Sequence, residues 1–299
     1  MEAKPQKFQW HISGLNMLAK CGVQFERRYM LGERLRPGMG AITGTGVDRS
    51  VTHNLDTRIN TGKSAAESEV LDIARDTVKA EWEQGVAEDA DYKRNGSRAQ
   101  GKAIDDAVKL AELHYLDVAP LLSPFAVQRE WVIDDTASGA QLVGTIDILN
   151  QTGKGVEILD TKTSKRAPAE GAAHESLQLT GYALAMVVID RIKAPVTVGL
   201  DYLVKTEIPK WVALRAKRNV SDFAHLAERL RRAEEIRKAG AFQPAPVDSW
   251  WCSADWCGYH STCRFARQPK SVPAADTAKA FQKSLELVQI KEKSDAASE

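Results

Sequence analysis

Residues 144–165, GTIDILNQTGKGVEILDTKTSK, contain two short apolar segments joined by a polar turn with two glycines. Both segments are rich in β-branched residues, so the stretch predicts an antiparallel β-hairpin. Each segment also carries an aspartate, Asp147 or Asp160, and Lys162 follows two positions after the second. A carboxylate within an apolar strand is costly to bury unless a charge compensates it, and a metal ion would do so. The hairpin therefore predicts a strand pair and a candidate metal site together.

The expected register brings these residues to one face of the hairpin. If NQTGKG forms a symmetric turn, Asp160 lies opposite Thr145 and Asp147 opposite Ile158, so the two aspartates are diagonal neighbours about 7–8 Å apart. Lys162 projects from the same face as Asp160. Two acids and a lysine suit metal-assisted phosphodiester hydrolysis, because magnesium prefers oxygen ligands and activates bound water. A surface ion pair across a hairpin is the alternative interpretation.

The flanking sequence alternates helical and strand patterns. We expect helices at residues 13–31, 40–59, 64–84, 97–118, 174–192 and 221–239. We expect strands at residues 126–134, 140–149, 155–163, 196–204 and 211–216. This order predicts an α/β fold, in which helices cover a sheet. We expect an N-terminal helical region (1–120), an α/β core (121–240), a cysteine-rich segment (241–268), and a C-terminal helix and tail (269–299).

The bulk composition is that of an ordinary globular protein. The chain has 299 residues, of which 43% are hydrophobic and 27% charged. A formal net charge of +1 means that any contact with nucleic acid must come from a local basic patch. No apolar run is long enough for a membrane span, and the N-terminus lacks the apolar centre of a signal peptide. We therefore expect a cytoplasmic protein with reduced cysteines.

Three motifs in order, GTIDIL, ILDTKT and QLTGY, resemble the PD-(D/E)XK nuclease superfamily. The resemblance is to its RecB-like branch, similar to CRISPR-associated and phage iron–sulfur nucleases. It implies a restriction-endonuclease-like fold, with a mixed central sheet flanked by helices. It implies catalytic roles for Asp147, Asp160, Lys162, Gln178 and Tyr182, and Mg²⁺ or Mn²⁺ ligation by His53, Asp147, Asp160 and the carbonyl of Thr161. Without the resemblance, His53 is an ordinary surface histidine, and Gln178 and Tyr182 are packing residues on one helix face.

The four cysteines are one early residue, Cys21, and three late ones, Cys252, Cys257 and Cys263. The resemblance implies a 4Fe-4S cluster with this distribution, although the gap between Cys252 and Cys257 is wider than the family pattern. Four thiols also satisfy tetrahedral zinc, which is the alternative, and buried thiols without metal are a third interpretation. A cluster would tie the C-terminal segment to the first helix.

Local basic residues are the remaining signal for nucleic acid. We expect Lys210, Arg215, Lys217 and Arg218 to contact phosphates, without reading base sequence. The resemblance then implies a metal-dependent deoxyribonuclease, an exonuclease, in a bacterial or phage-infected cell. It implies a role in DNA recombination, repair or phage DNA processing, with recombination or replication proteins as partners. The alternative is a DNA-binding module of the same fold with weak or no catalysis, whose cysteines hold zinc.

Overall fold

The computed structural model describes residues 7–246 and 248–266 of the chain. The chain forms two compact units, residues 1–258 and 259–299. The described part of the smaller unit contains a short 3-10 turn, His260–Thr262. The C-terminal helix and tail that we expected at 269–299 lie outside the described residues.

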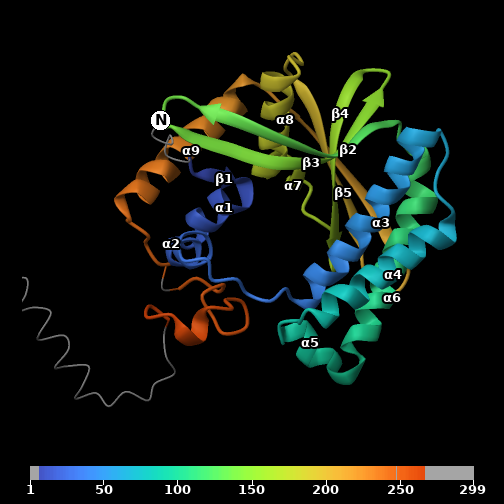
Figure 1. Ribbon diagram of the computed structural model, residues 1–299, viewed down its shortest axis with the longest axis horizontal. Coiled ribbons are helices and arrows are strands. Elements are labelled where there is room, and N and C mark those ends of the chain that lie inside the picture. Colours follow the sequence, from blue (N-terminus) through green and yellow to red (C-terminus); the bar gives the residue numbers. More distant parts are fainter. Residues whose placement is uncertain (1–6, 247, 267–299) are drawn as a thin grey trace, which may run out of the picture. The chain divides into compact units, whose positions relative to one another are not determined.

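Six strands of the larger unit form one mixed sheet (Figure 1). They are β1 (Gln9–His11), β2 (Pro124–Asp135), β3 (Ala140–Thr152), β4 (Gly155–Ser164), β5 (Val196–Val204) and β6 (Lys210–Arg218). The order is β1-β3-β4-β5-β6, and β2 pairs with β3. The β1–β3 and β4–β5 pairs are parallel, whereas β2–β3, β3–β4 and β5–β6 are antiparallel. The predicted strands are confirmed, and β1 is an additional strand too short to show a pattern.

The main helices of the larger unit cover the two faces of this sheet. They are α1 (Ile12–Lys20), α2 (Gly22–Phe25), α3 (Met39–Thr61), α4 (Glu67–Glu83), α5 (Ala90–Asn95), α6 (Ala99–Leu113), α7 (Ala172–Glu175), α8 (Leu177–Ile189) and α9 (Val220–Ala239). The helix predicted at residues 13–31 is broken, because Cys21 is extended (φ −164°, ψ 109°) and separates α1 from α2. None of the helices within the described ranges is both long and apolar enough to span a lipid bilayer.

Two hydrophobic cores lie on opposite faces of the sheet. The first, here the α8 core, packs strand residues such as Leu142, Ile146 and Ile158 against α1, α8 and α9. The second, here the α3 core, packs Ile148 and Leu159 against α3, α4 and α6. Burying an aliphatic side chain of this size contributes about 1.5–3 kcal/mol. Helices on both faces of a mixed sheet confirm the predicted fold class.

Candidate active site

The hairpin aspartates lie where strands β3 and β4 separate. The last paired residues in the direction of the aspartates are Ile148 and Leu159. Asp147 and Asp160 come next in the same register, so they are directly opposite each other just beyond the last pair. The sequence had predicted a diagonal placement, with Asp160 opposite Thr145. The turn is two residues long and joins Thr152 to Gly155, which shifts the register and brings the acids closer together than expected.

Strand β3 changes face at Asp147. Ile146 belongs to the α8 core and Ile148 to the α3 core, although residues two apart share a face in a regular strand. The opposing residue on β2 is Gln128, between the pairs Val127–Ile148 and Arg129–Ile146. Gln128 has a left-handed backbone (φ 47°), which is strained for a residue with a side chain. Strain of this kind often marks a functional position.

Lys162 supplies the positive charge nearest to the paired acids. The Asp160 side chain has no exposed surface, and Lys162 Nζ lies 2.8 Å from its Oδ1 and 2.6 Å from its Oδ2. Burial lowers the pKa of Lys162, but the carboxylates of Asp160 and Asp147 outweigh this and raise it. Lys162 is therefore an ammonium at neutral pH.

A third carboxylate, Asp48 on α3, faces the same site. Its Oδ1 accepts a hydrogen bond from Gln128 Nε2 at 3.3 Å. Burial raises the pKa of Asp48, and the negative charge of Asp160 raises it further. Because Gln128 also donates to Thr52 Oγ1 at 3.2 Å, the strained residue joins β2 to α3 beside the acids. The sequence interpretation missed Asp48, although it follows the glycine-rich run GMGAITGTGV that places α3 against β4.

His53 is not brought to the acids in this structure. Its Nε2 lies 2.9 Å from Glu69 Oε1 on the neighbouring helix α4. His53 and Asp48 are five residues apart, or about 1.4 turns, so they lie on different faces of α3. The helix face that meets the hairpin therefore presents Asp48, and His53 pairs with α4.

Gln178 and Tyr182 reach the site from α8. Gln178 Nε2 lies 2.5 Å from Tyr182 Oη, and Tyr182 Oη donates to Asp147 Oδ1 at 3.3 Å. Tyr182 is 4% exposed, and burial followed by the nearby Asp147 charge raises the pKa of its phenol. Gln178 lines the open cleft in front of Tyr182. Gln178 and Tyr182 therefore share one face of α8, as predicted, and the chain of hydrogen bonds from Gln178 through Tyr182 ends at the Asp147 carboxylate.

Arg218 anchors the start of α8. It is 1% exposed, and its Nη2 donates to the carbonyls of Ala173, His174 and Ser176 at 2.6, 3.1 and 3.1 Å. Its Nε donates to Thr180 Oγ1 at 2.8 Å. The guanidinium of Arg218 is therefore occupied inside the molecule, next to Ser176 and Thr180 at the start of α8, and does not offer the surface contact with phosphate that the sequence predicted.

The acids and Lys162 open into a cleft of about 390 Å³ between α3 and the hairpin. Burial raises the pKa of Asp147 well above its ordinary value, and the adjacent Asp160 raises it further. Two carboxylates this close carry two negative charges when both are ionised, and Lys162 offsets only one of them. A divalent cation would offset the other. The lining residues are Gly40, Ala41, Gly44, Thr45, Val47, Asp48, Gln128, Asp147, Thr161, Lys162, Thr163 and Gln178.

This donor set fits a hard divalent cation. Asp48, Asp147 and Asp160 offer only oxygen atoms, and the Thr161 hydroxyl is buried without a hydrogen-bond partner within the described part of the chain. Across residues 7–246 and 248–266, no three His, Cys, Asp or Glu side chains are already arranged around an ion position. The Lys162 ammonium instead contacts both oxygens of Asp160.

The cysteines are not gathered into a ligand set in the larger unit. Cys21 and Cys257 are buried, and Cys257 Sγ accepts a hydrogen bond from Gln24 Nε2 at 3.0 Å. Cys252 is half-buried, and Cys263, also half-buried, belongs to the smaller unit. Cys257 therefore lies against α2, which begins one residue after Cys21.

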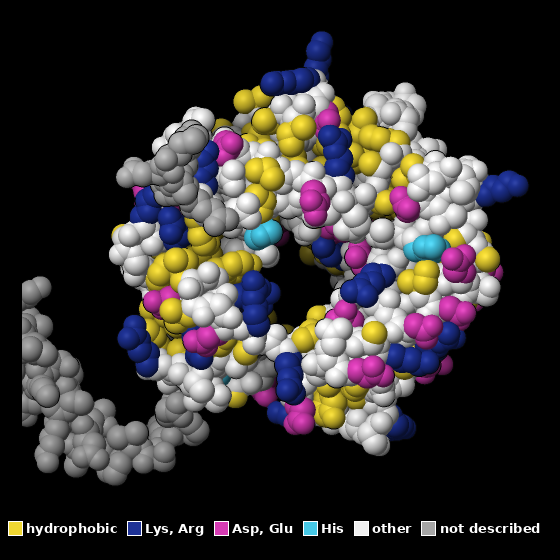
Figure 2. All heavy atoms as spheres, in the orientation of Figure 1, with side chains coloured by type: hydrophobic (Ala, Val, Ile, Leu, Met, Phe, Trp, Pro, Cys, Tyr) yellow, Lys and Arg dark blue, Asp and Glu magenta, His cyan; other side chains and the backbone are white. Residues whose placement is uncertain are grey.

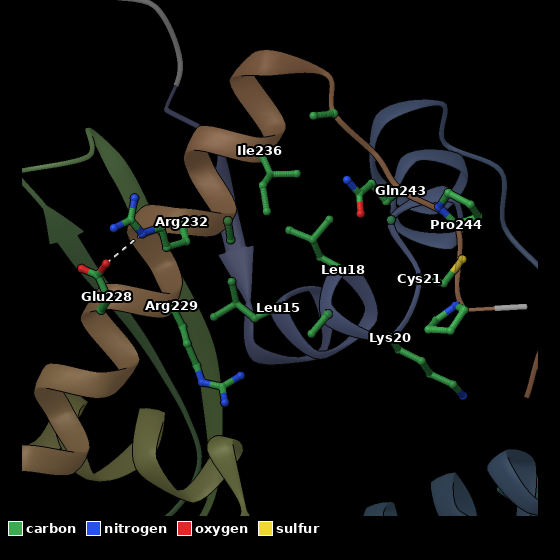
Figure 3. A pocket seen from close by; sticks show the side chains of 15 residues that line it. Leu15, Leu18, Lys20, Cys21, Glu228, Arg229, Arg232, Ile236, Gln243 and Pro244 are labelled. Carbon is green, nitrogen blue, oxygen red and sulfur yellow. Dashed lines mark hydrogen bonds and ion pairs between the residues drawn. The ribbon is translucent and has the colours of Figure 1, made fainter. Parts of the chain in front are cut away.

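A larger cavity, about 620 Å³, lies between α1 and α9 (Figure 3). Leu15, Leu18 and Ile236 point toward one another across it, and Arg232 pairs with Glu228 at its rim. Its walls are mostly apolar and carry no pair of facing acids. This cavity is larger than the cleft beside the acids, but only the cleft combines carboxylates with Lys162, so we take the cleft as the candidate active site.

The basic residues predicted on β6 have different surroundings. Lys210 and Lys217 are exposed, and Arg218 is buried. Arg215 is exposed, but it donates to Asp201 at 3.0 Å and to Glu157 at 2.7 Å, so its charge is balanced by two carboxylates of the same sheet. On the face shown in Figure 2, basic and acidic side chains alternate over the helices α4 to α6, as the net charge of +1 suggests.

A mixed sheet that carries facing acids and an Asp-x-Lys strand suits the metal-assisted hydrolysis of phosphodiesters. The family model of the PD-(D/E)XK nuclease superfamily matches residues 9–264. The chain belongs to this superfamily, and it is a nuclease of restriction-endonuclease-like fold.

Solved structures agree on the fold. A crystal structure of a candidate exonuclease from Eubacterium rectale has a TM-score of 0.54 at 13% identity, covering 87% of this chain and 90% of that one. A structure of the protein SSO0001 has a TM-score of 0.33 at 13% identity, covering 74% of this chain and 86% of that one, which is too low a score to indicate a common fold. No curated protein matches the chain.

Proposed function

We propose that this nuclease hydrolyses DNA phosphodiester bonds with Mg²⁺ or Mn²⁺, and that it works from DNA ends. The observation that carries the proposal is the pair Asp147 and Asp160, facing each other beyond the last β3–β4 pair with Lys162 beside them. The candidate exonuclease of similar fold supports activity at ends. Roles in recombination, repair or phage DNA processing, and protein partners in those processes, follow from the family resemblance.

The divalent ion would be held by the carboxylates of Asp48, Asp147 and Asp160. The backbone carbonyl of Thr161, predicted from the resemblance, would be a fourth ligand. When bound, the ion polarises the phosphoryl oxygen and lowers the pKa of a water molecule. The oxygen of water would form a bond to phosphorus while the bond to the leaving deoxyribose oxygen breaks; the water would release its proton to solvent, and the leaving oxygen would take a proton from solvent. The resemblance implies His53 as a further ligand, but His53 pairs with Glu69 and Asp48 lines the cleft, so we propose Asp48 in its place.

The chain's own residues position and neutralise the reacting groups. Lys162 is protonated, so it stabilises negative charge on the phosphate and donates a hydrogen bond; it does not accept the proton of water. Tyr182 fixes the Asp147 carboxylate through its hydroxyl, and Gln178 orients that hydroxyl. Gln128 holds Asp48 toward the cleft.

Cleavage of labelled linear and covalently closed circular DNA, with Mg²⁺, Mn²⁺ or EDTA, tests this function. We expect linear DNA to be degraded in either metal, circular DNA to persist, and EDTA to stop cleavage. Asp160→Ala should abolish cleavage and keep the circular dichroism spectrum. Cleavage of closed circles would refute action from ends, and full activity of Asp160→Ala would refute the site. Binding of DNA without cleavage in any metal would support the non-catalytic alternative.

The 4Fe-4S cluster remains a prediction, with zinc as the alternative. The position of Cys257 against α2 supports a link between the early and late cysteines. Iron, sulfide and zinc analysis of protein purified without oxygen tests it. Four iron atoms per chain, lost together with thermal stability in Cys21→Ala, are expected; iron-free protein with an unchanged melting temperature would refute the cluster.

A further inference from the structure

Three lysines gather at the edge of the sheet where the parallel strands β4 and β5 end. Lys165 follows the last residue of β4, and Lys205 follows the last residue of β5. The backbone N–H of Lys205 donates to the carbonyl of Ser164 at 2.7 Å, which holds the two strand ends together. Lys102 comes from α6, which packs against β5, and its positive charge contributes to lowering the pKa of Lys205. We call Lys102, Lys165 and Lys205 the lysine group.

The positive charge of this group is not fully balanced. Lys165 forms an ion pair with Asp91, and Lys102 forms one with Asp106. Lys205 is half-buried and forms no ion pair with any residue that the structure describes. Burial lowers the pKa of Lys205; Asp106 and Asp91 oppose this effect, and the positive charges of Lys165 and Lys102 add to it. Three ammonium groups face two carboxylates here, so one positive charge is left to attract an anion.

The lysine group lies in line with the catalytic strand. Strand β4 carries Asp160 and Lys162 toward the edge at which Lys165 emerges. At about 3.3 Å per residue, Lys165 is about 10 Å beyond Lys162 and about 16 Å beyond Asp160. That span corresponds to a few nucleotides of DNA backbone. Thr163, which lines the acid cleft, is two residues from Lys165, so the two side chains share one side of β4. A DNA strand whose scissile phosphate lies at the acids can run along that side and place a neighbouring phosphate at the lysine group.

We propose that Lys102, Lys165 and Lys205 form a phosphate-binding subsite, which holds the nucleic-acid backbone a few nucleotides from the bond that is cut. The inference rests on the proposed nuclease function and adds a substrate class to it: polynucleotide strands long enough to span both positions. Short fragments that occupy only the acid cleft lose this contact and are held weakly. The subsite binds phosphate by charge, so it accepts any base sequence.

Two substrates separate the subsite from the catalytic cleft. Thymidine 5′-monophosphate p-nitrophenyl ester offers one phosphodiester and no neighbouring backbone, whereas a single-stranded 20-mer offers both. We compare wild type with Lys165→Ala/Lys205→Ala, with Lys205→Arg, which keeps the charge, and with Lys154→Ala. Lys154 is an exposed lysine in the turn at the other end of β4, which makes it a matched control.

The double variant should lose about tenfold or more in kcat/KM on the 20-mer, because it lacks two charged contacts to the substrate backbone. Hydrolysis of the p-nitrophenyl ester should be unchanged. In EDTA, fluorescence anisotropy should show weaker 20-mer binding, with a salt slope shallower by about 0.7 for each lost phosphate contact. Lys205→Arg and Lys154→Ala should resemble wild type.

An equal loss on both substrates, or unchanged 20-mer binding and salt slope in EDTA, would overturn the subsite. A loss that also appears in Lys154→Ala would overturn it as well, because it would report general surface charge. If wild type hydrolyses neither substrate, the proposed function fails, and the anisotropy experiment in EDTA still decides on the subsite. Melting temperatures of all variants separate misfolding from loss of contact.

Discussion

Replacing Asp147 by asparagine should make the metal-free protein more stable while abolishing cleavage. Burial and the neighbouring Asp160 raise the folded-state pKa of Asp147 above its ordinary value of 3.8. The folded protein therefore keeps this proton at pH values where the unfolded chain has lost it. Above pH 3.8, the stability of the metal-free protein falls as the pH rises, until the pH passes the raised folded-state pKa. Asparagine carries no charge at any pH, so the variant does not lose folding stability in this way as the pH rises.

The size of the effect follows from the charges at the site. Two unit charges about 4 Å apart repel by about 4 kcal/mol at an effective dielectric constant of about 20. Lys162 Nζ, 2.6 Å from Asp160 Oδ2, offsets part of this repulsion. If half remains, Asp147→Asn stabilises by about 2 kcal/mol, since its Oδ1 still accepts the Tyr182 hydrogen bond. For a chain of 299 residues, about 2 kcal/mol raises the melting temperature by about 3 °C.

Thermal unfolding at pH 5 to 8, in EDTA and in Mn²⁺, measures this effect. Mn²⁺ should stabilise wild type increasingly as the pH rises and should leave Asp147→Asn unchanged. Asp134→Asn is the control, because Asp134 is half-exposed and paired with Lys7 on the surface, so its loss changes stability by no more than about 0.5 kcal/mol. A metal-free Asp147→Asn protein that melts below wild type at pH 7 would refute the electrostatic reasoning.

Asp48→Ala should reduce DNA cleavage about 100-fold, whereas His53→Ala should stay within a few-fold of wild type; similar losses in steady-state rates would contradict the assignment of Asp48. Tyr182→Phe should reduce kcat about tenfold and change the free energy of unfolding by only about 1 kcal/mol, because one hydrogen bond to Asp147 is lost; an unchanged kcat would mean that the hydroxyl is not needed. Arg218→Met should lower the free energy of unfolding by about 3 kcal/mol, since three carbonyls lose their buried donor; urea denaturation checks this, and a loss below about 1 kcal/mol would show that water replaces the guanidinium.

The sequence was sufficient for the sheet and for the chemistry of the hairpin. Period-two patterns with β-branched residues located β2 to β6, and aspartates in apolar strands located the acids. The register was wrong because the position of the turn was inferred from polar residues, whereas the two-residue turn at Gly153 and Lys154 decides it. Both registers place Asp147 and Asp160 on one side, so the candidate site was unaffected by the error.

The third carboxylate could not be chosen from the sequence. Asp48 and His53 lie on one helix, and only the rotation of α3 against β4 decides which of them faces the hairpin. That rotation depends on tertiary packing, such as the close approach of Gly44 to Thr163. The glycine-rich run indicates a close contact, but it does not indicate which side chain of α3 faces the hairpin. The left-handed backbone of Gln128 is equally invisible, because nothing in its neighbours requires it.

The basic residues show the same limit. Lys210, Arg215, Lys217 and Arg218 are clustered in sequence, but alternation along β6 sends neighbouring side chains in opposite directions. Arg218 points into the molecule and Arg215 pairs with Asp201 and Glu157. The lysine group, in contrast, is assembled from three separate segments. Charge clusters in sequence and in space are therefore different sets in this protein.

Binding of Mn²⁺, followed by the loss of the electron paramagnetic resonance signal of the free ion, tests most directly whether the facing acids hold a divalent cation. Wild type should bind Mn²⁺ at neutral pH, and Mg²⁺ should compete for the same position. Asp160→Asn, which keeps the shape of the side chain, should lose that binding while remaining folded. Equal Mn²⁺ binding by wild type and by Asp160→Asn would contradict the account of the site.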